Sequence, residues 1–257
     1  MSKKLIIVLA HQDDEFCIFN KISSFKNKNN IFIFYLTSGL NNNLNKFSKN
    51  LRDNESLKVL RRFGILERNI FFLGRKYSIN NNCLYLNLDT AYKDLVKIIK
   101  KIPGKKIALT HALEGGHEDH DACYYLVKAI NIKYNLFENS FQFPAYHGKN
   151  LPYIFFKVFS PISENGYVIK EKIKFNDRFK FIYYLFFYKS QLKIWIGLYP
   201  FIIFKFLFNK KDSIQKINKN KHIRKPHKGK LLYEKRKFCK YSKFRKKLLI
   251  FFNKNII

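Results

Sequence analysis

Cysteine is scarce in this sequence, and the cysteines that occur are far apart. The 257 residues contain only four, Cys17, Cys83, Cys123 and Cys239, and no CxxC pair. This spacing supports neither a cysteine-ligated zinc site nor a dense disulfide framework, so we expect a reduced, cytoplasmic protein. A signal peptide is also missing, because the apolar run LIIVLA is short and leads directly into His11 and acidic residues.

A clean membrane-spanning run is missing as well. The longest apolar region, residues 181–208, is interrupted by Lys189, Lys193 and Lys205 and is broken by Pro200. A spanning helix needs about 20 mostly apolar residues. We therefore expect this region to be an interfacial or core segment.

Acidic side chains are few: 18 Asp and Glu stand against 50 Lys and Arg, a formal net charge of +32. Lysine has A+T-rich codons, so codon bias weakens this charge as evidence of function. Half of it, a net +16, falls in residues 209–257, where Asp212 and Glu234 are the only acids. Such a tail attracts phosphates and anionic lipid headgroups. Peripheral association with an anionic membrane, at its inner face, is one expectation, and a solvated basic tail is the other.

Nucleic acid is not an expected partner. The sequence has no ribonucleoprotein signature, zinc-finger spacing or basic zipper. An internal repeat and a flexible linker are also missing, so we expect one domain over residues 1–208, followed by a basic C-terminal extension over residues 209–257.

Strand-like and helix-like segments alternate through the first half of the chain. Buried strands are predicted by the apolar runs at 4–10, 31–37, 69–74 and 105–111. Helices are predicted between and after them, at 15–27, 51–65, 90–102 and 118–133. This alternation predicts an α/β fold with a Rossmann-like, mostly parallel sheet and helices on both faces. After residue 150, strand-like segments at 153–159 and 167–175 and then helices form a strand/helix extension.

Two unusual polar clusters follow predicted strands. LAHQDDEFC, residues 9–17, crowds His11, Asp13 and Asp14 beside Glu15, and THALEGGHEDHDACYYL, residues 110–126, carries two histidines three positions apart. Ligands of open parallel sheets bind beyond the carboxyl ends of the strands. We therefore expect the two clusters to share one rim of the sheet.

The residue types in these clusters suit a catalytic metal centre. His11, Asp14 and His120 would supply two imidazoles and one carboxylate, which suits zinc and leaves a coordination position open. Asp13 and His117 would remain free for proton transfer and charge stabilisation. The alternative is an ordinary polar cluster at the strand ends.

The two motifs resemble those of the PIG-L/LmbE-like family of zinc-dependent N-acetylglucosaminyl deacetylases. The family motif AHPDDE corresponds to residues 10–15, with Gln12 in place of proline, and HPDH corresponds to residues 117–120, with Glu118 in place of proline. Neither proline holds metal. Weaker matches extend over most of residues 4–195, at 37–39 (TSG), 52–55 (RDNE), 72–74 (FLG) and 188–191 (YKSQ). The aspartate-bearing loop that follows FLG in the family is absent here.

This resemblance implies a metal-dependent N-deacetylase with one Zn²⁺ per chain, held by His11, Asp14 and His120. It implies that Asp13 is the general base toward a metal-activated water. His117, oriented by Asp119, would stabilise the oxyanion and protonate the leaving amine. The implied substrate is an N-acetylated amino sugar of the N-acetylglucosamine type, or its conjugate.

Further residues are expected to bind substrate. Arg52 is a candidate ligand for a sugar hydroxyl, with a surface ion pair as the alternative, and we add Ser38 and His147 as candidates near the rim. His111 either lines the pocket or is structural. Two other functions stay open: a metal-dependent amidase acting on a non-sugar metabolite, and an inactive basic protein that binds nucleic acid or membrane.

Overall fold

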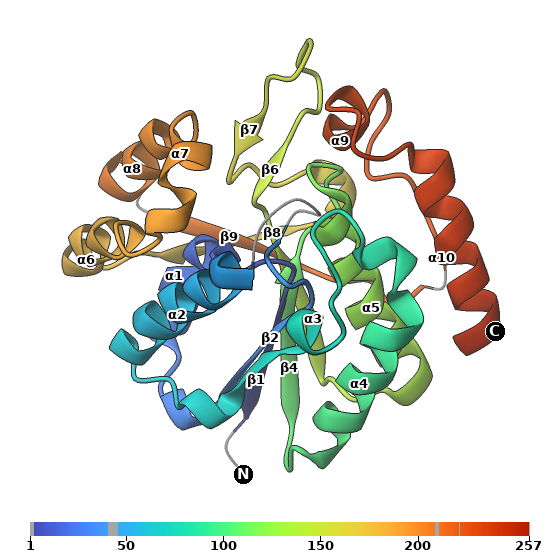
Figure 1. Ribbon diagram of the computed structural model, residues 1–257, viewed down its shortest axis with the longest axis horizontal. Coiled ribbons are helices and arrows are strands. Elements are labelled where there is room, and N and C mark those ends of the chain that lie inside the picture. Colours follow the sequence, from blue (N-terminus) through green and yellow to red (C-terminus); the bar gives the residue numbers. More distant parts are fainter. Residues whose placement is uncertain (1–2, 41–45, 209–210, 221, 257) are drawn as a thin grey trace.

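The computed structural model describes residues 3–40, 46–208, 211–220 and 222–256 (Figure 1). Its main sheet has seven strands in the order β3-β2-β1-β4-β5-β9-β8. The first five are parallel, and β9 is antiparallel to both of its neighbours. The bounds are β1 Lys4–Leu9, β2 Ile31–Tyr35, β3 Ile70–Phe72, β4 Lys106–His111, β5 Asn139–Phe143, β8 Val168–Lys172 and β9 Lys211–Lys216. A separate pair joins β6 (Tyr146–His147) to β7 (Lys157–Val158).

Helices cover both faces of this sheet (Figure 1). Alternate residues of β1 divide between two cores, because successive side chains of a strand point to opposite faces. Ile6 and Val8 pack with α4, α5 and α10, whereas Leu5 and Ile7 pack with α1, α2, α6 and α8. The helices are α1 Phe19–Ser24, α2 Lys46–Arg62, α3 Leu73–Lys76, α4 Leu88–Lys101, α5 Glu118–Tyr134, α6 Phe175–Leu185, α7 Leu192–Trp195, α8 Tyr199–Phe208, α9 Leu232–Lys235 and α10 Tyr241–Asn255. The predicted α/β class and parallel sheet are confirmed.

Besides β9, which lies in the expected basic extension, two strand assignments differ from the sequence-based expectation. The segment NSFQF forms β5, although its short polar and apolar alternation gave no buried-strand signal. The apolar run 153–159 was expected to be a strand, but only Lys157–Val158 pairs. The preceding Tyr153, Ile154 and Phe155 are exposed in the loop between β6 and β7.

The C-terminal segment contributes a strand to the main sheet and a helix to the core. β9 lies inside the sheet, between β5 and β8. Phe244 and Phe252 of α10 are buried in the same core as α4 and α5. The expected boundary at 208/209 falls at residues 209–210, which lie outside the described residues. Among the described residues, no helix combines the length and the apolar character needed to cross a bilayer.

Close backbone approaches fix the loops at the carboxyl edge of the sheet. At Gly74, the first turn of α3 lies against the backbone of Thr37, and an added Cβ would overlap it. At Gly116, before α5, an added Cβ would overlap the carbonyl oxygen of Tyr146. Gly74 thus allows the segments after β2 and β3 to meet, and Gly116 allows the segments after β4 and β5 to meet.

Candidate active site

The loop after β1 is held by its own carboxylates. The amide of His11 donates to Asp14 Oδ2 at 2.6 Å, and the amide of Asp13 donates to Glu15 Oε2 at 3.0 Å. Tyr188 donates its hydroxyl to the other Glu15 oxygen at 2.8 Å. Asp13 has φ of 126°, a conformation that side-chain-bearing residues rarely adopt. Such strain persists where surrounding contacts over-determine it, and it is common at functional sites.

The second cluster begins α5. His117 is the N-cap, and its Nδ1 accepts the amide proton of Asp119 at 3.1 Å. A neutral imidazole that accepts at one nitrogen carries its proton on the other, so Nε2 of His117 is a donor. Asp121 accepts the amides of Glu114 and Gly115, each at 3.1 Å, which fixes the turn before the helix.

Asp14 lies among three imidazoles. Its oxygens are 3.4 Å from His11 Nδ1, 3.1 Å from His111 Nε2 and 3.3 Å from His120 Nε2. Burial alone would raise the pKa of this carboxyl, but the surrounding imidazoles hold it well below its usual value. Asp14 is therefore an anionic carboxylate where the loops after β1 and β4 meet α5.

Asp119 supports the cluster from behind. Its carboxylate accepts the amides of Asn82 at 2.7 Å and Leu84 at 3.0 Å, and it lies 3.1 Å from His11 Nε2. Burial would lower the pKa of His11, but the Asp14 and Asp119 carboxylates raise it to about 10. With Nε2 held by Asp119, Nδ1 of His11 faces Asp14. Metal-binding histidines commonly have this carboxylate partner on the second nitrogen.

The residues present fit a divalent cation. Ligand atoms of His11, Asp14 and His120 all lie within 4.8 Å of one another. His120 is only 2% exposed, yet neither of its ring nitrogens has a hydrogen-bond partner among the described residues. A buried polar atom without a partner is costly, and a metal would satisfy it. A second set, His11, His117 and Asp119, meets the same distance limit.

Asp13 differs from Asp14 in its pKa and in the charged group beside it. Burial raises the pKa of its carboxyl to about 7, against the lowering influence of Arg52. The Arg52 Nη2 atom lies 3.2 Å from Asp13 Oδ1 and donates to the carbonyl of Gln12 at 2.7 Å. Arg52 Nη1 also donates to the carbonyl of Gly39 at 2.6 Å. Asp13 is thus a restrained carboxyl that can exchange a proton near neutral pH.

A pocket of about 600 Å³ is lined by His11, Asp13, Asp14, Arg52, His117 and His120 from these clusters. Segments that begin after residue 140 supply its upper wall, which contains Tyr146, Phe156, Trp195, Leu198, Arg236 and Phe238. No sequence motif predicts that these residues line the site. The sequence predicts that the aromatic stripes are core and that the C-terminal cations form a tail. Trp195, the single tryptophan, is the one residue whose rarity could have indicated a place in the site.

Of the three residues expected to bind substrate, one lines the pocket and two do not. Arg52 lines the pocket. Ser38 is fully buried, and its hydroxyl donates to Asn80 Oδ1 at 3.1 Å. His147 lies in the β6–β7 pair, with Nε2 at 3.0 Å from the Ser160 carbonyl and Nδ1 accepting the Lys149 amide at 3.2 Å. Neither is among the described residues that line the pocket.

The contacts of Asp119 and His111 show how each residue relates to the two clusters. Asp119 orients His117 through its backbone amide, while its carboxylate contacts His11. His111 is fully buried and stacks on His120, with ring centroids 3.8 Å apart. Burial, with a smaller contribution from His120, lowers the pKa of His111 to about 4. His111 therefore packs against Asp14 and His120 without lining the pocket in the described part of the chain.

Comparison with known families identifies the first half of the chain. Residues 6–131 match the family model described as PIG-L: GlcNAc-PI de-N-acetylase. The matched range contains both polar clusters, so the resemblance inferred from the motifs is confirmed. No curated protein matches the sequence.

Solved structures with the same fold include two described as a deacetylase–bog complex in the teicoplanin pathway and the zinc-inhibited teicoplanin deacetylase Orf2. Each has 12% sequence identity and a TM-score of 0.62, over 86% of this chain and 100% of that chain. The conserved protein TT1542 from Thermus thermophilus has 13% identity and a TM-score of 0.56, over 86% and 97% of the two chains. These likenesses show the fold.

Proposed function

Since residues 6–131 form a PIG-L domain, we propose that this protein is a metal-dependent hydrolase that removes the acetyl group from an N-acetylated amino sugar or its conjugate. The observation that carries the proposal is that two neighbouring aspartates lie in different surroundings. Asp14 lies among three imidazoles, while Asp13 lies beside Arg52 with a pKa of about 7.

His11, Asp14 and His120 would hold the metal. Two imidazoles and one carboxylate suit zinc. Zinc bound there would polarise the acetyl carbonyl and supply a hydroxide near neutral pH. The protein's part is to fix these three side chains, which it does through Asp119 on His11 and His111 on His120.

Asp13 is the proposed general base. A base works best when its pKa lies near the working pH, and burial brings this carboxyl to about 7. Arg52 restrains the carboxylate from one side, so Asp13 can accept a proton from the attacking water and hold it within the pocket. Asp13 lines the pocket, and its backbone has the unusual φ of 126°.

His117 is the proposed donor to the developing oxyanion. Its Nδ1 is occupied by the Asp119 amide, so Nε2 carries the proton and is available to the reacting carbonyl. A donor aimed at developing charge in a partly water-excluded pocket lowers the barrier more than the same donor in water. The same proton can pass to the leaving amine.

The pocket favours a sugar-sized substrate. Its volume of about 600 Å³ falls within the usual range for small-ligand sites. Tyr146, Phe156 and Trp195 offer flat apolar surfaces for the C–H faces of a pyranose, and Arg52 offers a donor for a hydroxyl. An amide-bearing metabolite without a sugar is the competing substrate class.

An acetate-release screen tests the proposal. The zinc-loaded full chain would be assayed on N-acetylglucosamine, N-acetylgalactosamine and their phosphate and lipid conjugates, with non-sugar N-acetyl amides alongside. We expect acetate only from amino-sugar compounds. Release only from the non-sugar amides would assign the competing class, and no release from either, with zinc bound, would reject the deacetylase.

A further inference from the structure

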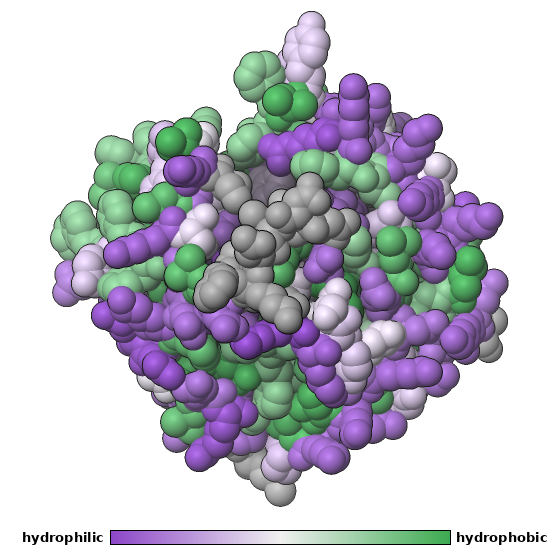
Figure 2. Space-filling view, viewed as in Figure 1, coloured by the Kyte–Doolittle hydropathy of each residue, from purple (hydrophilic) through white to green (hydrophobic). Residues whose placement is uncertain are grey.

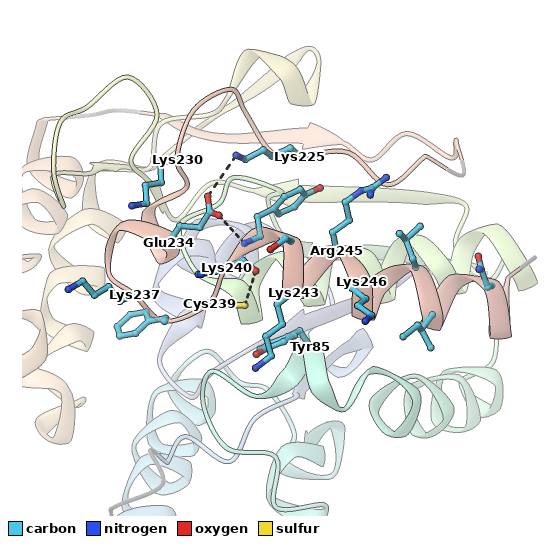
Figure 3. A pocket seen from close by; sticks show the side chains of 16 residues that line it. Tyr85, Lys225, Lys230, Glu234, Lys237, Cys239, Lys240, Lys243, Arg245 and Lys246 are labelled. Atoms are coloured by element: carbon cyan, nitrogen blue, oxygen red, sulfur yellow. Dashed lines mark hydrogen bonds and ion pairs between the residues drawn. The ribbon is translucent and has the colours of Figure 1, made fainter.

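A second cavity lies beside the active-site pocket. It has a volume of about 1110 Å³ and follows the chain from Lys225 through α9 to α10 (Figure 3). On α10, Tyr241, Arg245, Leu249 and Asn253 line it at every fourth position, so they share one side of the helix. From the first to the last of these residues the helix rises about 18 Å. The cavity is therefore an elongated groove.

The groove adjoins the pocket at one short segment. Phe238, which is half exposed, lines both cavities. Of the two residues before it, Arg236 lines the pocket and Lys237 lines the groove. The Arg236 guanidinium lies over the rings of Tyr146 and Phe156, 5.8 and 5.1 Å from their centroids. A ligand that fills the pocket can therefore continue past Phe238 into the groove.

Cationic side chains gather in this groove. Figure 2 shows hydrophilic side chains over the part of the surface where Figure 1 places α9 and α10. Glu234 is the single acidic residue that lines the groove in the described part of the chain. Its two oxygens accept the amides of Leu231 and Tyr241, each at 2.9 Å, and its cationic neighbour is Lys225, at 3.8 Å. No carboxylate of the described residues pairs with the other cations of the groove, which are Lys230, Lys237, Lys240, Lys243, Arg245 and Lys246.

These features suit a ligand that is both acidic and sugar-like. Neighbouring cations repel one another, and a negatively charged ligand relieves that repulsion. An ammonium is a compact point charge that pairs with carboxylate and phosphate alike. Phe238 at one end of the groove and Ile250 near the other are each half exposed, and they offer apolar surface to the C–H faces of sugar rings. A second copy of the chain fits poorly, because each copy carries a formal net charge of +32.

We propose that the groove binds an acidic oligosaccharide that carries the N-acetyl amino sugar held in the active-site pocket. The substrate class is then a charged glycan chain, with the reacting sugar in the pocket and the following sugars along α10. This step rests on the proposed deacetylase function. Arg236 and Lys237 lie at the junction, where they would pair with the first acidic group beyond the reacting sugar.

Glycans without an acetyl group test the groove separately from the reaction. The zinc-loaded full chain would be titrated in a calorimeter with tetragalacturonate, which has a carboxylate on every sugar, and with neutral cellotetraose. Phosphorylated cellotetraose, tested alongside, distinguishes phosphate from carboxylate as the preferred acidic group. An acidic chain should bind about tenfold or more tighter than the neutral one at low salt, and less so as salt screens the charges. Equal binding of neutral and acidic chains would overturn the proposal.

Charge reversal on α10 locates the binding. Lys243→Glu/Lys246→Glu should lose about tenfold or more in affinity for the acidic chain, through lost and reversed ion pairs. Lys230→Glu/Lys240→Glu repeats the test just before α9 and α10, and unchanged thermal unfolding would show that each variant folds.

A matched control makes the same charge change elsewhere. Lys97→Glu/Lys101→Glu replaces exposed residues near the end of α4, outside the groove, and should bind the acidic chain like the wild type. Equal losses in the control and the groove variants would mean non-specific charge attraction and would overturn the proposal. Tighter binding of a single-stranded oligothymidylate of equal charge would also overturn it, and would assign the groove to nucleic acid.

Acetate release connects the groove to the proposed function. With zinc bound, kcat/KM should be about tenfold or more higher on a heparosan tetrasaccharide, in which N-acetylglucosamine alternates with glucuronate, than on neutral chitotetraose. Lys243→Glu/Lys246→Glu should lose most of this preference, and Lys97→Glu/Lys101→Glu should keep it. Acetate release without the preference would keep the deacetylase and overturn the role of the groove. Binding of acidic chains without any acetate release would support the groove and reject the deacetylase.

Discussion

Asp13 and Asp14 are adjacent in the chain, but their carboxylates face different charged groups. Asp14 faces three imidazoles, and Asp13 faces the guanidinium of Arg52. Between them, the backbone at Asp13 has an unusual φ of 126°. The sequence motif predicted the two clusters and their meeting, but the partners of each side chain depend on this local geometry and could not be read from spacing.

His120→Ala should remove most of the bound metal. The change deletes one of the three proposed ligands and leaves only Asp14 and His11 of that set. The measurement is elemental analysis of the purified protein after zinc loading and dialysis. His147→Ala is the matched control, since both of its ring nitrogens are engaged within the hairpin. Full zinc retention in His120→Ala would remove this residue from the metal centre.

The elements best predicted from sequence were those buried on both sides. Runs such as KLIIVL and IFIFY are continuous and apolar because helices cover both faces of a parallel sheet. β5 was missed because NSFQF lacks such a run, and 153–159 was mistaken for a strand because apolar residues at a surface give the same signal as a core. Burial is a tertiary property, and periodicity alone does not report it.

Gly74→Ala should lower the free energy of unfolding by about 1–3 kcal/mol, the usual cost of overpacking a tight contact. The added methyl would overlap the backbone of Thr37, which has no freedom to move because β2 leads directly into it. Urea denaturation at neutral pH is the measurement. Gly197→Ala is the control, since nothing lies within 4 Å of its added Cβ. Equal stabilities for the two variants would contradict the close approach.

At the scale of the whole molecule, described residues after 208 contribute to the same core and the same pocket as the first half of the chain. β9 lies within the main sheet, and Arg236 and Phe238 form part of the pocket wall. The composition of this segment predicted a basic tail, because lysine hides the spacing of Phe244, Leu248 and Phe252 that buries one side of α10. Part of the pocket wall, including Tyr146, Trp195, Arg236 and Phe238, thus comes from segments in which no motif indicated a site.

The burial of Lys128 between α5 and the C-terminal segment makes the free energy of unfolding depend on pH. From α5, its ammonium donates to Asn220 at 3.0 Å and to the carbonyl of His222 at 2.9 Å. Burial, with a smaller contribution from Arg224, lowers the pKa of Lys128 to about 8, from 10.5 for a free side chain. Between these two values the unfolded chain binds more protons than the folded one, so this group's contribution to stability rises with pH.

Comparison with Lys128→Met isolates that contribution. The unfolding free energy of the wild type, minus that of the variant, should increase as the pH rises from 8 to 10.5. Chemical denaturation at several pH values would measure both proteins. A difference that stays constant or falls over this interval would contradict the buried position of the Lys128 ammonium.

The most direct test of the account is Asp13→Asn, with zinc content and acetate release measured on the same preparation. Asparagine keeps the shape of the side chain and tolerates positive φ better than most residues, but it cannot accept a proton. Because Asp13 is not a proposed ligand, zinc should stay at the wild-type level. Acetate release should fall by about 100-fold or more, the scale of general acid–base catalysis. A zinc-replete Asp13→Asn protein with near-normal acetate release would contradict the assignment of Asp13 as the base.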